Sequence, residues 1–118
     1  MTALALLIAL NLIILVAHLI EEIKTGFFDK FPLGKIPTPL AIGLNSLLYL
    51  GILLTIYLAL AGNPVAVTLA WVFALLMLSN ALLHLGLMLR RKRYFPGGIT
   101  AGLLLPASIW LLLYLYRL

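Results

Sequence analysis

Residues 2–24, TALALLIALNLIILVAHLIEEIK, decide the fold class, because this long run carries almost no charge before its end. At about 1.5 Å of rise per residue, about twenty apolar residues in a helix cross the roughly 30 Å hydrocarbon core of a bilayer. The whole chain of 118 residues is 65% hydrophobic and only 9% charged. Soluble domains carry about 25% charged residues, so we predict an integral membrane protein.

Three further apolar runs follow the first. Glycine and proline break the chain between them, in GFFDKFPLGKIPTP (26–39), AGNPV (61–65) and YFPGG (94–98). The predicted membrane spans therefore cover residues 2–23, 39–61, 64–90 and 98–117. We expect one domain over residues 1–118, an all-α, integral membrane four-helix bundle.

The basic residues predict how this bundle is oriented. Seven of the eight lie in the first and third loops: Lys24, Lys30, Lys35, Arg90, Arg91, Lys92 and Arg93. Basic residues in short loops favour the cytoplasmic side, so we expect both loops inside the cell, both termini outside, and a location in the cell (inner) membrane. Such clusters are typical of contacts with membrane lipids rather than with nucleic acid.

Polar side chains in the first span share one stripe. At about 100° per residue, Asn11, Glu21 and Glu22 all lie within about 60° of His18. Ionisable groups inside a membrane normally face the interior of a bundle. The spacing leaves open which of the two glutamates faces that interior.

The other spans offer polar residues at a similar depth. Asn80 and His84 are four residues apart, so they share one face of the third span. Asn45 lies in the second span and Thr100 near the start of the fourth. All of these positions are near the ends that we place on the cytoplasmic side. One layer of the bundle is therefore expected to collect them.

Histidines and glutamates from facing helices are the usual donors of metal sites in helix bundles. Two histidines with a carboxylate suit catalytic zinc or non-haem iron. The predicted ligands of a divalent metal ion, zinc or iron, are His18, Glu21, Glu22 and His84. Predicted acid–base or orienting residues of catalysis are Glu21, Glu22, Asn45 and Asn80, and predicted substrate contacts are Arg91, Tyr94 and Thr100. A metal-free acid–base pair and a purely structural polar layer are the alternatives.

Several of these residues form a known pattern. His18-Leu19-Ile20-Glu21-Glu22 resembles the HXXEE signature of a family of small polytopic membrane proteins. NALLH (80–84) resembles the polar pair of the family's third span, and RYFPGGITAGLLLPAS (93–108) its Tyr-x-Pro-Gly segment. The resemblance implies a four-helix membrane fold with a shared polar site, and it implies no particular reaction.

The function that we expect is a membrane-embedded metalloenzyme acting near the cytoplasmic face on a lipid-like or amphiphilic substrate. Hydrolysis by metal-activated water is favoured over iron-dependent oxidation. One alternative is a small proton-coupled transporter that uses a membrane carboxylate and works as a homodimer. The other is a structural membrane subunit.

Overall fold

The computed structural model describes all 118 residues and contains four long helices and no strands. The helices are α1 (Thr2–Thr25), α2 (Thr38–Leu60), α3 (Val65–Arg91) and α4 (Gly98–Tyr116). All four are long and apolar enough to cross a membrane. The predicted all-α four-helix bundle is confirmed, and the helix ends lie within about two residues of the predicted spans. A short 3-10 helix, η1 (Phe27–Asp29), follows α1 and was not predicted.

Two glycines end or begin helices in the left-handed region of backbone space. Gly26, with φ of 76°, closes α1, and its N–H returns to the last carbonyls of that helix. Gly97, with φ of 89°, stands immediately before α4. Side chains disfavour this conformation, so the glycines fix where the chain leaves one helix and enters the next.

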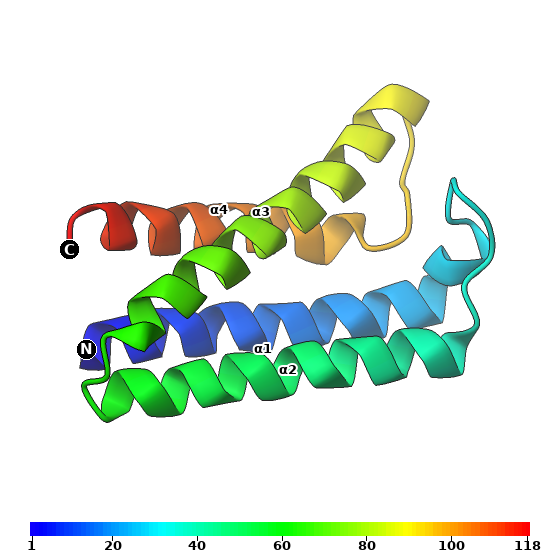
Figure 1. Ribbon diagram of the computed structural model, residues 1–118. Helices are drawn as coiled ribbons and strands as arrows, with labels where there is room; N and C mark the ends of the chain where they lie inside the picture. The colour runs from blue at the N-terminus through cyan, green and yellow to red at the C-terminus, as the bar shows by residue number, and fades with distance from the viewer.

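The helices are arranged so that both chain ends lie together (Figure 1). α1 and α2 run side by side and antiparallel, α3 crosses them obliquely, and α4 packs on both α1 and α3. The loops that follow α1 and α3 lie at the end of the bundle opposite the termini. The seven clustered basic residues therefore belong to one end of the molecule, which we call the basic end.

Buried stripes on two helices set the direction of the polar side chains. On α1 the stripe advances in steps of three and four through Leu4, Ile8, Asn11, Leu15, His18 and Glu22. On α3 it runs through Ala66, Ala70, Ala74, Met77, Ala81 and His84. Small residues let membrane helices approach closely, and the polar residues that end each stripe are carried into the interior near the basic end.

Candidate metal centre

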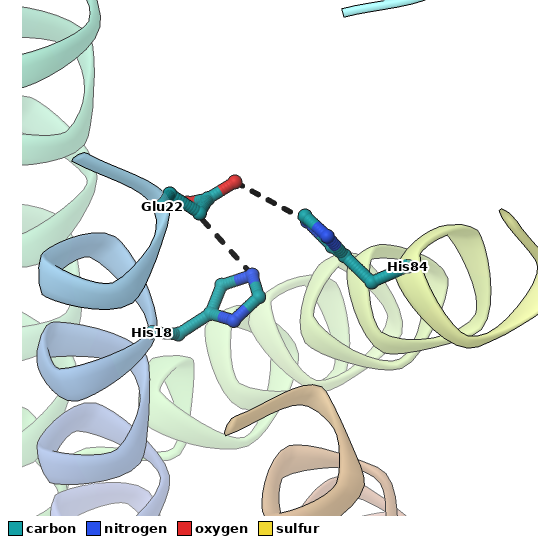
Figure 2. A group of neighbouring side chains, drawn as sticks. All are labelled: His18, Glu22 and His84. Atoms are coloured by element: carbon teal, nitrogen blue, oxygen red, sulfur yellow. Dashed lines mark ion pairs between the residues drawn. The ribbon is translucent and has the colours of Figure 1, made fainter. Parts of the chain in front are cut away.

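Three side chains from two helices meet in the interior near the basic end (Figure 2). His18 and Glu22 come from α1, and His84 comes from α3. His18 Nε2 lies 3.8 Å from one oxygen of Glu22, and His84 Nε2 lies 3.2 Å from the other. Both histidines are fully buried and Glu22 is 6% exposed. The two imidazole rings stand edge to face, with their centroids 4.5 Å apart.

The hydrogen bonds of His84 decide which of its nitrogens carries a proton. Nδ1 lies 2.7 Å from the carbonyl oxygen of Pro96. A carbonyl only accepts, so Nδ1 must donate, and the neutral ring keeps its lone pair on Nε2. That buried nitrogen faces Glu22 but has no hydrogen-bond partner.

This unpaired nitrogen fits a divalent metal ion. A lone pair pointing at a carboxylate is unfavourable unless a cation or proton lies between them. One ligand atom each from His18, Glu22 and His84 falls within 4.8 Å of the others. Tetrahedral zinc with bonds of about 2.0–2.1 Å holds its ligands roughly 3.3 Å apart. The donor types suit zinc or iron, and small movements would bring them to binding distance.

The backbone of Gly97, in the turn before α4, packs closely against both imidazole rings. A Cβ atom added to Gly97 would lie 2.5 Å from Cε1 and Nδ1 of His84 and 2.9 Å from Cε1 of His18. Contacts that short require something to move. Gly97 therefore serves two needs, its positive φ and the close approach of its backbone to the histidine rings.

Aromatic side chains cover the outer side of the group. The ring of Phe27, from η1, has its centroid 4.6 Å from that of His84, and the centroid of the Phe95 ring lies 6.3 Å from that of His84. Both phenylalanines are buried. The guanidinium of Arg91, a predicted substrate contact, lies over the Phe95 ring, 4.9 Å from its centroid. No pocket opens onto the three polar side chains.

Glu21, predicted as a metal ligand, lies outside this group. Its carboxylate accepts the backbone N–H groups of Ile99 at 3.1 Å and Thr100 at 2.8 Å, at the start of α4. The hydroxyl groups of Thr100 and Tyr94 also bond to it. The first turn of a helix is a favourable place for an anion. Both oxygens are thus used in fastening α1 to α4, and Glu22 is the glutamate that faces the histidines.

Tyr94, a predicted substrate contact, donates its hydroxyl hydrogen to Glu21, and the residue is 44% exposed. Burial and the hydrogen bond that its hydroxyl donates to Glu21 raise the pKa of Tyr94 above its ordinary value. Its neutral, hydrogen-donating form is therefore the one that the fold favours.

The remaining predicted residues divide into two sets. Asn80 and Thr100 reach His18: the side-chain oxygen of Asn80 lies 3.3 Å from Nε2 and the hydroxyl of Thr100 lies 2.7 Å from Nδ1. Asn45 instead donates to the carbonyl of Ala41 in its own helix, at 2.8 Å, and makes no hydrogen bond to the group. The predicted polar layer thus forms from α1, α3 and α4, and α2 adds no side chain to its hydrogen bonds.

Four contributors to the site were not predicted as site residues. The carbonyl of Pro96 orients His84, the backbone of Gly97 lies against both histidine rings, and the rings of Phe27 and Phe95 pack beside His84. The PGG sequence was a signal for the first, because glycine beside proline permits close backbone approach. Nothing in the sequence distinguishes Phe27 from an ordinary loop aromatic.

Fold and site together define a small all-helical protein, with four helices able to cross a membrane and a buried His/Glu group. The chain belongs to the family described as proteins of unknown function with an HXXEE motif, whose model matches residues 9–111. The resemblance drawn from the sequence is thereby confirmed. Searches of curated proteins and of solved structures gave no match.

Proposed function

We propose that the protein is a membrane-embedded metalloenzyme whose divalent ion is held by His18, Glu22 and His84. The observation that carries the metal site is the buried Nε2 of His84, which faces a carboxylate with no hydrogen bond. Three protein donors leave a position for water, as in catalytic zinc sites, whereas structural zinc takes four. A bound zinc ion would supply a water that is acidic enough to attack at neutral pH.

Hydrolysis by metal-activated water is the reaction that we favour. Asn80 places an amide beside the donors, which can hold a polar group of a substrate. Because no pocket leads to the group, substrate entry requires the covering rings of Phe27 or Phe95 to move aside. These rings lie at the basic end, where the polar head of a lipid-like substrate would meet the site.

Metal analysis tests the first half of this proposal. The protein, purified in detergent and repleted with zinc or iron(II), is expected to hold about one ion per chain. His18→Ala and His84→Ala should lose the ion. Leu83→Ala should retain it, because Leu83 is next to His84 in the chain but lies on the outer surface of the bundle. An empty wild-type protein after repletion would overturn the metal site.

Activity measurements test the second half. Hydrolysis of amphiphilic esters, amides or phosphoesters in mixed micelles should require the added metal and should disappear in Glu22→Gln. A proton-coupled transporter is the rival function, because Glu22 is a buried carboxylate beside two proton acceptors. Proton-driven uptake into liposomes that needs Glu22 and no metal would favour the transporter.

A further inference from the structure

Glu21 is the HXXEE glutamate that does not face the metal donors, yet one side chain links it to them. The Thr100 hydroxyl lies 2.6 Å from a carboxylate oxygen of Glu21 and 2.7 Å from Nδ1 of His18. A row of three groups, Glu21–Thr100–His18, therefore joins the start of α4 to the polar group in the interior.

The direction of the hydrogen bonds in this row follows from the number of protons available. An ionised carboxylate only accepts, and Glu21 already receives two backbone N–H groups and the hydroxyl of Tyr94. The hydroxyl of Thr100 has one proton, which it donates to Glu21. Its oxygen is then left as an acceptor toward His18, so Nδ1 of His18 must be the donor.

This fixes the nitrogen that His18 offers to a metal. A neutral imidazole carries one N–H, and with that proton on Nδ1 the lone pair lies on Nε2. Nε2 is the atom that faces Glu22 and the amide of Asn80, whose Oδ1 lies 3.3 Å away. Because an oxygen cannot donate to a lone pair, the amide of Asn80 must turn to present its NH2 group to Nε2 in this tautomer. We propose that Glu21 is a positioning residue that acts through Thr100 to hold His18 in the tautomer whose Nε2 binds the metal.

The two histidines are thus prepared in the same way by different partners. His84 donates from Nδ1 to the carbonyl of Pro96, and His18 donates from Nδ1 to the hydroxyl of Thr100. Partners behind the ligands of a metal typically change its affinity by about 10–100-fold when they are removed. This inference rests on the proposed metal site, and it assigns the two glutamates of the motif different tasks.

The experiment compares two threonine changes of the same kind. Thr100→Val removes the hydroxyl but keeps the side-chain shape and the backbone N–H bonds to Glu21. Thr55→Val makes the same change at a buried threonine that bonds only to the carbonyl of Gly51 in its own helix. Thr100→Ser restores a hydroxyl at the site, and Glu21→Gln removes the charge.

Two measurements are made on each variant. The first is the ¹⁵N spectrum of metal-free, histidine-labelled protein at about pH 8, which distinguishes Nδ1–H from Nε2–H; with two histidines in the chain, His84→Gln assigns both. The second is zinc affinity. We expect Nδ1–H on His18 in the wild type, in Thr100→Ser and in Thr55→Val. Thr100→Val should lose that form and bind zinc about 10–100-fold more weakly, with Glu21→Gln changing both in the same direction.

Each outcome bears on one proposal. If Thr100→Val keeps both the Nδ1–H form and the wild-type affinity, the positioning role is wrong. The role is equally wrong if Thr55→Val weakens zinc binding as much as Thr100→Val does. A wild-type protein that binds no zinc overturns the proposed metal site instead, and the tautomer of metal-free His18 still tests the role of Glu21.

Discussion

Gly97→Ala tests whether the turn before α4 is fitted to the two imidazoles. The residue has φ of 89°, and an added Cβ would lie 2.5 Å from Cε1 and Nδ1 of His84. Gly26 provides a matched control, because its φ is 76° and nothing lies within 4 Å of the position of its Cβ. Both changes impose the same backbone conformation on alanine, and only one meets a side chain.

The structure gives the size of the expected difference. Left-handed backbone costs an alanine about 1–2 kcal/mol at either site. At Gly97 the His84 ring must also move by about 1 Å to regain a normal contact of roughly 3.5 Å. That movement breaks the bond to the Pro96 carbonyl, and a buried polar group without its partner costs about 1–3 kcal/mol. Gly26→Ala should therefore lose about 1–2 kcal/mol of unfolding free energy and Gly97→Ala about 2–5 kcal/mol.

The assay is equilibrium unfolding by SDS in mixed micelles, together with a zinc titration of each variant. Gly97→Ala should weaken zinc binding by about tenfold or more, since displaced ligands and their partners typically cost that much. Gly26→Ala should bind zinc as the wild type does. Equal losses of stability in the two variants, with zinc affinity unchanged in both, would refute the fit between Gly97 and the histidines.

Three further predictions concern the rim, the interior and the orientation of the bundle. The fold raises the pKa of Tyr94, so the stability that this adds is fully present below the ordinary tyrosine pKa of about 10 and is lost as pH rises above it. Unfolding midpoints should therefore fall more steeply above about pH 10 in the wild type than in Tyr94→Phe. The control is Tyr57→Phe, which should behave like the wild type because the Tyr57 hydroxyl makes no hydrogen bond. Asn80→Ala should lower zinc affinity by about tenfold, whereas Ser79→Ala should not, because that hydroxyl bonds only to its own helix; equal affinities would exclude Asn80 from the site. Since the chain has no cysteine, single cysteines at Lys35 and Arg93 should resist an impermeant maleimide on intact cells while those at Thr2 and Leu118 react, and the reverse labelling would invert the predicted orientation.

The number and limits of the helices were predictable because they depend on local properties of the chain. Runs of about twenty apolar residues cannot leave backbone polar groups unpaired in lipid, so they must form helices. Glycine and proline mark where those helices stop, as at Gly26 and Gly97. The gathering of His18 and His84 near one end also follows from the sequence, because each lies toward the C-terminal end of its span and the first and third spans run in the same direction.

The roles of the individual polar residues were less accessible. Most residues of α1 are apolar, so only its few polar positions distinguish the inner face from the outer one. The angular spacing alone allowed either glutamate to face the interior. Asn45 has the right depth in α2, but its amide bonds within its own helix. The depth of a residue along a span can be read from the sequence. The rotation of the helix about its axis depends on the side chains of the neighbouring helices.

The sequence by itself thus determined a four-helix membrane bundle with a polar layer at its basic end. Only the tertiary structure decided that Glu22 joins His18 and His84, and that Glu21 holds the start of α4. The physical reason is packing. The stripe of α1 that reaches Glu22 is buried against the other helices, while Glu21, one residue earlier, meets the N–H groups that α4 leaves unpaired at its first turn. The approach of Gly97 to the histidine rings is likewise a contact between distant segments, which no local pattern contains.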